Sequence, residues 1–254
     1  MSKAPFIHHL VQSSIFLLLP MLLQGQDFTY GTAIVILRTP NTIYAAADSM
    51  LVTAGSTTTE TECKIRFAGE TGFALAGIFV EPASGFDLIK ITKKVCLADR
   101  PLTAKFASLE EAVRTPLLSA MNNIYHHPLS PTLDHLGVQI ALFGFEGKTP
   151  YVYRITLDAV AEGSNVTDLR VKKTIIPDEK NNEPYSLVFL AQSADVLATL
   201  QSTRLSGKDW RDALNQVIQL AIEKNPSSVG PPVDIVEVTD QGRRWLQRKD
   251  GCPD

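Results

Sequence analysis

The chain has 254 residues, of which 44% are hydrophobic and 20% charged, a composition that suffices for one globular domain with a substantial core. The formal net charge of −3 is spread along the chain without long blocks of one sign. The sequence therefore lacks the basic surface that nucleic acids and anionic membranes attract, and we expect no nucleic-acid partner.

Residues 1–25 have the pattern of a secretory signal peptide. Lys3 precedes an apolar run over residues 15–23, and a polar segment begins at Gln24. The run is shorter than the roughly 20 apolar residues of a membrane-spanning helix, and Pro20 interrupts it. The pattern predicts export from the cytoplasm without a stable membrane anchor. The alternative is an N-terminal helix that packs on the domain.

A β-hairpin is predicted shortly after this segment. Apolar and β-branched residues favour strands over 32–37 and 42–47, and the Pro40-Asn41 pair suits the turn between them. Asp48 follows the second strand, and Thr32, at the start of the first, is expected to be exposed. A further buried strand is predicted over 72–78 because the run is short and apolar.

Helices and strands then follow in groups. Ser108 with Glu111 three residues later forms a capping-box pattern, which predicts that a helix begins there and extends to about residue 125. Further helices are expected at 86–96, 194–205 and 208–224, and further strands at 137–144, 151–155, 185–190 and 233–238. This order favours an α+β fold with two antiparallel sheets stacked face to face and helices on both outer faces, a four-layer αββα sandwich. Residues 241–254 are expected to form a charged tail.

The sequence offers little metal-binding chemistry, and no cofactor or metal is expected. The polar side chains that cluster in one Pro-rich segment are His126, His127, Asp134 and His135. A surface loop is favoured over a metal site there, because two adjacent histidines rarely bind one ion and the helical spacing of metal-binding histidines is absent. The cysteines, Cys63, Cys96 and Cys252, are too far apart in sequence for a zinc site and allow one disulfide.

One spacing resembles a known family. Thr32 follows Gly31, and Asp48 and Lys64 lie 16 and 32 residues beyond Thr32. This spacing, with the flanking segments 46–49 and 74–77, is similar to that of the β-type subunits of the proteasome and their bacterial relatives. The resemblance extends over nearly all of residues 32–238, and it implies the sandwich fold of the N-terminal-nucleophile hydrolases.

The resemblance implies a threonine-type hydrolase that cleaves peptide or amide bonds. Once the preceding residues are removed, Thr32 would be the nucleophile and its own α-amino group the base. Lys64 would stabilise the anionic threonine oxygen, and Asp48 would keep Lys64 charged and oriented. The backbone N–H of Gly77 would point at the developing oxyanion.

Two routes to a free Thr32 are expected. Cleavage at the Gly31–Thr32 bond would produce it directly, whereas cleavage after Gly25 would leave residues 26–31 as a short propeptide that the threonine hydroxyl then removes. The domain would then extend over residues 32–240. Because relatives assemble into rings, the resemblance also allows a homo-oligomer.

Two other functions remain open. One is a non-catalytic scaffold of the same fold, and the other is an amidase that acts on a small amide rather than a peptide. The chain also departs from the family near its C-terminus, where Asn225 or Ser228 would have to replace a supporting aspartate and serine. A further supporting serine would correspond to Gln192 or Ser193.

Overall fold

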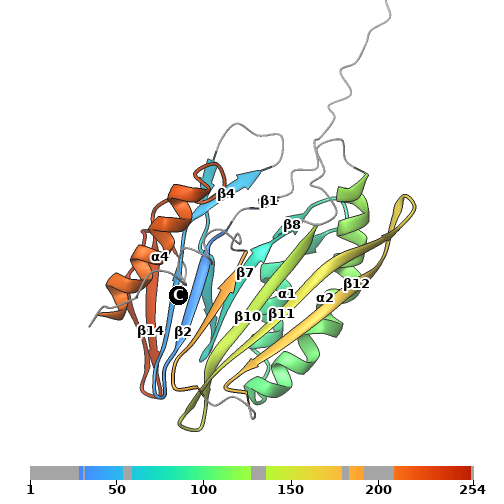
Figure 1. Ribbon diagram of the computed structural model, residues 1–254. Coiled ribbons are helices and arrows are strands. Elements are labelled where there is room, and N and C mark those ends of the chain that lie inside the picture. The colour runs from blue at the N-terminus through green and yellow to red at the C-terminus, as the bar shows by residue number, and fades with distance from the viewer. Residues whose placement is uncertain are drawn as a thin grey trace, which may run out of the picture.

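The computed structural model describes residues 29–30, 32–53, 59–126, 136–178, 183–191 and 209–252. In these ranges the fold is α+β, with two five-stranded antiparallel sheets, two smaller sheets and three helices (Figure 1). The expected α+β class and the antiparallel pairing of strands are therefore confirmed. None of the described helices is both long and apolar enough to cross a membrane.

The first large sheet contains the predicted hairpin. Its strands, in spatial order, are β13 (Ser186–Leu190), β2 (Ile34–Arg38), β3 (Ile43–Ala47), β14 (Asp234–Thr239) and β15 (Gly242–Gln247). Every residue of β2 is buried, as expected for a central strand with both faces covered. The hairpin register sets Ile34 opposite Ala47, so the start of β2 and the end of β3 lie at the same end of the sheet.

The second large sheet contains the longest strands. Its order is β12 (Asn165–Ile176), β11 (Thr149–Glu162), β10 (Gly137–Glu146), β7 (Thr71–Gly77) and β6 (Ile65–Ala68). Strand β12 was not expected, because its side chains are largely polar and its buried apolar residues are Val166 and Leu169. It exists because it pairs with β11 along nearly its whole length, from Glu162–Asn165 to Val152–Ile176.

The smaller sheets flank this framework. One consists of β1 (Thr29–Tyr30), β4 (Met50–Thr53) and β5 (Thr59–Thr61), and the other of β8 (Val80–Glu81) and β9 (Phe86–Asp87). In the first of them, β1 and β4 are antiparallel neighbours. The chain immediately before Thr32 is thus paired with the chain that follows Asp48.

The described helices are α1 (Leu88–Cys96), α2 (Leu102–Tyr125) and α4 (Trp210–Lys224). Helix α2 begins well before the predicted cap: Ser108 lies inside it and its hydroxyl donates to the carbonyl oxygen of Lys105 (2.9 Å). Tertiary packing explains the earlier start, because Leu102 and Phe106 belong to the same buried stripe as the rest of the helix. The helix expected at 194–205 lies outside the described residues.

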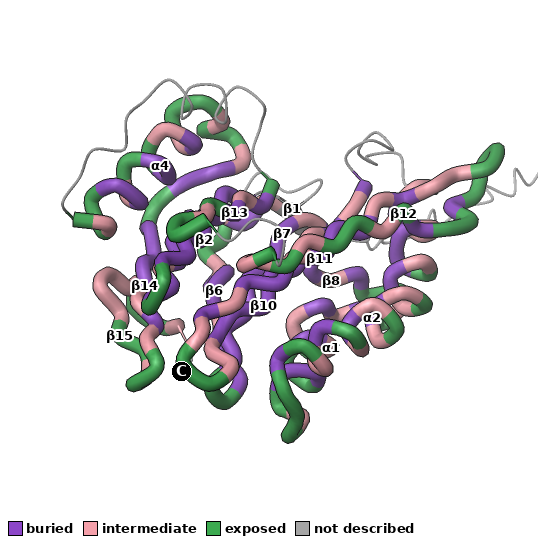
Figure 2. Tube along the Cα trace, turned by 60° about the horizontal axis from the view of Figure 1, so that its bottom comes forward, coloured by how far each residue is buried: buried purple, intermediate pink, exposed green. Residues whose placement is uncertain are grey.

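Three apolar clusters hold these elements together. One packs α1 and α2 on the second sheet, one contains residues of both large sheets, and one packs α4 on the first sheet. Helix α4 therefore lies on one side of the paired sheets and helices α1 and α2 lie on the other (Figures 1 and 2). In Figure 2 the buried residues are concentrated along the central strands and on the helix faces that meet them.

The expectation of a charged tail over residues 241–254 is wrong for its first half. Residues Gly242–Gln247 form β15, an edge strand paired with β14. The charges do not prevent this pairing, because the arginines lie on the surface of the sheet. Arg244 forms an ion pair with Glu237 (2.8 Å), and the Arg243 guanidinium lies over the Phe67 ring at 4.5 Å.

Candidate active site

The two large sheets bring four sequence-predicted residues to strand ends. Thr32 lies just before β2 and Asp48 just after β3, while Lys64 precedes β6 and Gly77 ends β7. In each antiparallel pair the start of one strand and the end of the next share one end of the sheet. Asp48 and Lys64, which come from different sheets, are in direct contact.

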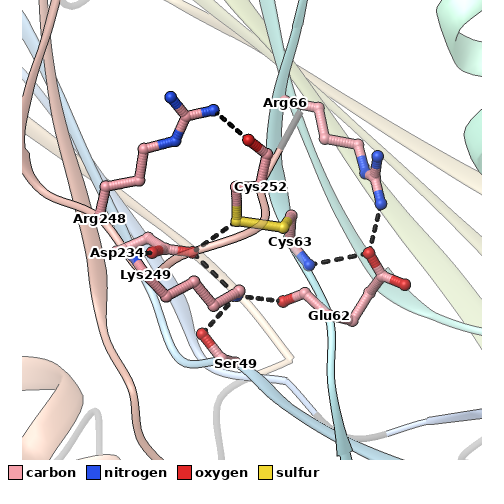
Figure 3. The surroundings of a disulfide bond; sticks show 8 residues. All are labelled: Ser49, Glu62, Cys63, Arg66, Asp234, Arg248, Lys249 and Cys252. Carbon is pink, nitrogen blue, oxygen red and sulfur yellow. Dashed lines mark hydrogen bonds and ion pairs between the residues drawn. A yellow bond between two sulfur atoms is a disulfide. The ribbon is translucent and has the colours of Figure 1, made fainter. Parts of the chain in front are cut away.

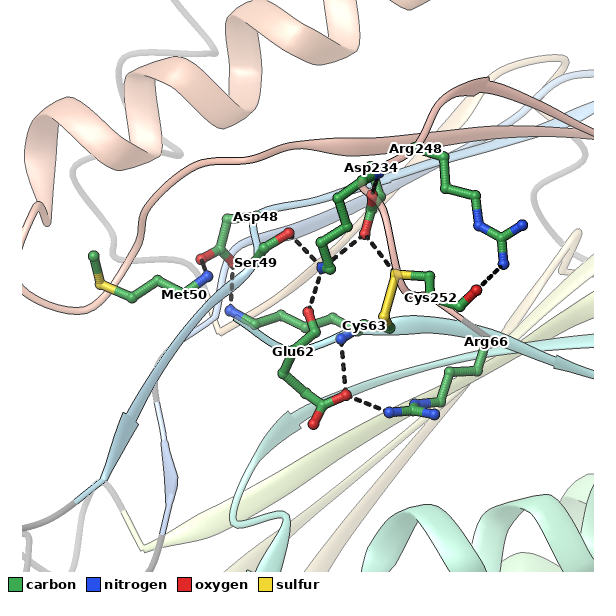
Figure 4. Close-up of polar contacts among 11 residues, drawn as sticks. Asp48, Ser49, Met50, Glu62, Cys63, Arg66, Asp234, Arg248 and Cys252 are labelled. Carbon is green, nitrogen blue, oxygen red and sulfur yellow. Dashed lines mark hydrogen bonds and ion pairs between the residues drawn. A yellow bond between two sulfur atoms is a disulfide. The ribbon is translucent and has the colours of Figure 1, made fainter. Parts of the chain in front are cut away.

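The Asp48 carboxylate is the centre of this contact. One oxygen, Oδ1, accepts from Lys64 Nζ (2.7 Å) and from the Ala33 N–H (2.7 Å). The other oxygen, Oδ2, accepts from the N–H groups of Met50 and Gly230, both at 3.1 Å. The side chain is fully buried, so these four donors replace the hydration that the charge has lost. Figure 4 shows the contact between Asp48 and the Met50 N–H.

Lys64 is as deeply buried as its partner, with 1% of its surface exposed. Burial lowers the pKa of Lys64 to about 8, because desolvation disfavours the ammonium, while the Asp48 charge and hydrogen bond oppose the shift. Lys64 therefore remains mainly charged at neutral pH and loses its proton in mildly alkaline solution.

Thr32 is not the exposed strand-start residue that the sequence suggested, since it is only 2% exposed. The chain on both sides of it is paired: β1 lies against β4, and the residue after Thr32, Ala33, is held by Asp48 at both backbone groups. The Ala33 N–H donates to the carboxylate (2.7 Å), and the Ala33 carbonyl accepts from the Asp48 N–H (3.1 Å). Asp48 thus fixes the backbone next to Thr32.

Gly77 has a structural reason to be glycine. Its φ of +97° lies in a region that favours glycine, and a Cβ at this position would lie 2.1 Å from the carbonyl oxygen of Gly137. Strands β7 and β10 could not come this close with any other residue there. This requirement is independent of an oxyanion role, which stays a prediction.

The C-terminal support of Asp48 comes from backbone rather than from the side chains that the sequence suggested. Asn225 and Ser228 belong to the turn that ends α4, where the Asn225 N–H donates to Ala221 and the Ser228 N–H to Asn225. The group that reaches Asp48 from this region is the N–H of Gly230. A backbone donor carries no sequence signal, so only the fold could identify it.

Several sequence candidates lie outside the described residues. They are Gln192 and Ser193, and, from the polar cluster, His127, Asp134 and His135. Within the described ranges, no group of three or more histidine, cysteine, aspartate or glutamate side chains is arranged to hold a metal ion.

Sequence reasoning missed a second buried ion pair beside the first. Lys249 Nζ lies 2.9 Å from Asp234 Oδ2, and it also donates to Ser49 Oγ (2.5 Å) and to the Glu62 carbonyl (2.6 Å) (Figure 3). A disulfide bonds Cys252, shortly after Lys249, to Cys63, which directly precedes Lys64. The odd number of cysteines concealed this pairing, and the charged composition of the C-terminal segment suggested a solvated tail.

The comparisons with known proteins identify a fold and not a family. No protein-family model matches the chain, and no curated protein matches it. Among solved structures, an Anbu (Gly-1) mutant from Hyphomicrobium sp. strain MC1 is similar, with a TM-score of 0.53 and 15% sequence identity over 87% of this chain and 89% of that one. At this identity the likeness concerns the fold alone, and the chain has a fold similar to that of Anbu.

Proposed function

We propose that the chain is a threonine-type N-terminal-nucleophile hydrolase that cleaves peptide or other amide bonds, with Thr32 as its nucleophile. The observation that carries the proposal is the buried Asp48 oxygen that accepts both from Lys64 Nζ and from the N–H of Ala33, each at 2.7 Å. Asp48 Oδ1 therefore accepts hydrogen bonds both from the Lys64 ammonium and from the backbone N–H next to Thr32. A cation held next to the Thr32 backbone would stabilise a threonine alkoxide electrostatically.

The finer description of the fold belongs to the same proposal. We infer the four-layer αββα sandwich of this hydrolase class, with α1 and α2 on one outer face and α4 on the other. The three apolar clusters and the likeness to Anbu support this inference.

The proposed chemistry begins once Thr32 is the first residue. Its free α-amine, with a typical pKa of about 7.7 to 8.0, takes the proton of the Thr32 hydroxyl as the oxygen attacks the substrate carbonyl carbon. The Lys64 charge stabilises the threonine oxygen, and the Gly77 N–H stabilises the tetrahedral oxyanion. When the C–N bond breaks, the leaving amine takes the proton from the α-ammonium. Water, activated by the same amine, then hydrolyses the remaining ester.

The pairing of β1 supports a peptide rather than a compact amide as substrate. Residues Thr29 and Tyr30 pair antiparallel with Thr53 and Val52 of β4. A stretch of extended peptide backbone thus already lies along β4 and ends just before Thr32. Removal of this stretch would leave the β4 edge available for an extended substrate to add as a strand.

The disulfide supports export. A bond between Cys63 and Cys252 persists in oxidising compartments such as the periplasm or the extracellular space and is rare in the cytosol. This agrees with the signal-peptide pattern of residues 1–25, which lie outside the described residues. We therefore propose that the mature protein acts outside the cytoplasm.

The first test of the proposal is the mature N-terminus. Intact-mass analysis of protein from the exported fraction should give a chain that begins at Thr32. A chain that stably keeps residues 26–31 would favour the scaffold, because a peptide-bonded nitrogen cannot act as the base.

The second test is hydrolysis by variants with a free first residue. Thr32→Ala should be inactive on a panel of peptides and small amides, whereas Thr32→Ser keeps the hydroxyl and should keep measurable activity. Thr167→Ala, at an exposed threonine of β12, is the matched control and should equal the wild type. Cleavage of small amides only would favour the amidase alternative, and wild-type activity in Thr32→Ala would refute the nucleophile.

A further inference from the structure

Lys249 is a buried lysine that the proposed chemistry does not use. Its side chain is 7% exposed, and its ammonium lies within hydrogen-bonding distance of three oxygens, those of Ser49 Oγ (2.5 Å), the Glu62 carbonyl (2.6 Å) and Asp234 Oδ2 (2.9 Å). Figure 3 shows these oxygens arranged around its Nζ. An ammonium with three donors can satisfy all three contacts at once.

Two of these partners are chain neighbours of the Asp48–Lys64 pair. Ser49 directly follows Asp48, and Glu62 lies two residues before Lys64. The two segments already meet here, because the Glu62 N–H donates to the Ser49 carbonyl (2.8 Å). Lys249 adds a second link across the same junction. Figure 4 shows Ser49 and Glu62 close to Asp48.

The position of Lys249 is itself fixed by two anchors. Its backbone N–H donates to Asp234 Oδ1 (2.8 Å), so this buried aspartate holds both ends of the residue. The Cys63–Cys252 disulfide then ties the segment covalently to the residue before Lys64. The C-terminal segment is therefore held by hydrogen bonds, an ion pair and a disulfide next to the segments that carry Asp48 and Lys64.

We propose that Lys249 is a positioning residue of the active site: it fixes the Asp48 and Lys64 segments relative to each other, and the Cys63–Cys252 disulfide holds it in place. This inference rests on the proposed function for its catalytic meaning. Its structural content, an action of Lys249 on Lys64, can be measured without any substrate.

The electrostatic environment of Lys64 gives the readout. Among the described charged groups, Asp48 and Glu62 raise the pKa of Lys64 and Lys249 lowers it. Removal of the Lys249 charge should therefore raise the pKa of Lys64 above about 8. The titration shows whether the Lys249 charge acts at Lys64, and the kcat of the folded variant shows whether Lys249 also positions the site.

The decisive variant is Lys249→Met combined with Asp234→Asn, made in the full chain. The double change avoids an unpaired buried aspartate, which could prevent folding by itself. The matched control is Lys173→Met with Glu110→Gln, another lysine–carboxylate pair at 2.7 Å that lies on the surface. Each protein is labelled with ¹³C-lysine, and Lys64 is titrated by NMR, its signal being assigned by its absence in Lys64→Met.

In the decisive variant we expect the Lys64 midpoint to rise by at least about 0.3 pH units, and kcat on a cleaved peptide to fall about tenfold or more with KM within about twofold. The control should match the wild type in both. An unmoved Lys64 titration, or a kcat within about twofold of wild type in the folded variant, would overturn the proposal.

A disulfide variant tests the second clause. Cys63→Ala with Cys252→Ala removes the bond without leaving a new thiol, and the Lys64 titration should move in the same direction because Lys249 is no longer fixed. An unchanged titration would show that the disulfide does not position Lys249. If the wild type with a free Thr32 cleaves no amide, the proposed function fails, whereas the titrations still decide whether Lys249 acts on Lys64.

Discussion

Asp48→Asn is the sharpest single perturbation of this site. The change keeps the shape of the side chain but removes its charge and turns one acceptor oxygen into an NH₂ donor. The carboxylate accepts from Lys64 and Ala33 on one oxygen and from Met50 and Gly230 on the other. In one orientation the new NH₂ group faces the donors of Lys64 and Ala33, and in the other it faces those of Met50 and Gly230. Either way a donor faces two donors.

The expected loss of stability is large. A buried charge that loses its partner typically costs about 3 to 5 kcal/mol, and each unsatisfied buried N–H adds about 1 to 3 kcal/mol, although these contributions do not sum. We expect the free energy of unfolding to fall by about 3 to 5 kcal/mol at pH 6, where Lys64 of the wild type is charged. Hydrolysis should also be lost, because the uncompensated Lys64 discharges more readily.

The pH dependence of this loss identifies its cause. The pKa of Lys64, about 8 in the folded protein, lies below its ordinary value of 10.5, and it should fall further without Asp48, which raises it. In the variant the unfolded chain then binds more protons at Lys64 than the folded chain over a window that extends below pH 8, so stability rises with pH there. The difference from wild type should be greatest near pH 6 and smaller near pH 9.

Urea denaturation of wild type, Asp48→Asn and Asp168→Asn at both pH values measures these effects. Asp168 is 65% exposed and pairs with Arg114, so its substitution should cost at most about 1 kcal/mol at either pH. A loss below about 1 kcal/mol in Asp48→Asn, or an equal loss at the two pH values, would refute the view that the buried pair organises the site.

Two further expectations follow from the same residues. For the protein with a free Thr32, kcat/KM should peak near pH 8. The α-amine (pKa about 7.7 to 8.0) must be neutral, whereas Lys64, with its pKa of about 8, must be charged. A kcat/KM that continues to rise to about pH 10 would contradict the role of Lys64. Gly77→Ala should destabilise the fold by more than about 2 kcal/mol in urea denaturation, because its Cβ would lie 2.1 Å from the Gly137 carbonyl oxygen. The control Gly147→Ala, which has open space around the new Cβ and a φ of +62°, should cost about 1 kcal/mol. Equal losses of stability in the two variants would contradict the steric argument.

Local features of the sequence predicted the elements that depend on neighbouring residues. The hairpin of β2 and β3 follows from two apolar, β-branched runs and a Pro-Asn turn within a few residues of each other. The resemblance of the Thr32, Asp48 and Lys64 spacing to that of proteasome β-type subunits implied that Asp48 holds Lys64, and the two side chains are in contact. The α+β class followed from the order of such elements, and it too is confirmed.

The start of α2 and the existence of β12 were decided by packing. The capping-box pattern at Ser108 is a local signal, but burial of Leu102 and Phe106 extends the helix beyond it. The polar side chains of β12 carry little strand signal, yet pairing with β11 makes the strand. In both places the tertiary environment outweighs the local preference.

The parts of the site that the sequence did not predict are contacts between residues far apart in the chain. Gly230 donates to Asp48 across 182 residues, Lys249 reaches Ser49 across 200, and Cys63 joins Cys252 across 189. Hydrophobic periodicity and turn signals report on a chain segment and its immediate neighbours, and none of them encodes which remote segment will lie alongside. The sequence by itself therefore determined the strands and the aspartate–lysine spacing, whereas the burial of Thr32 and the anchoring of Lys249 arise only when the C-terminal segment and β1 fold against that framework.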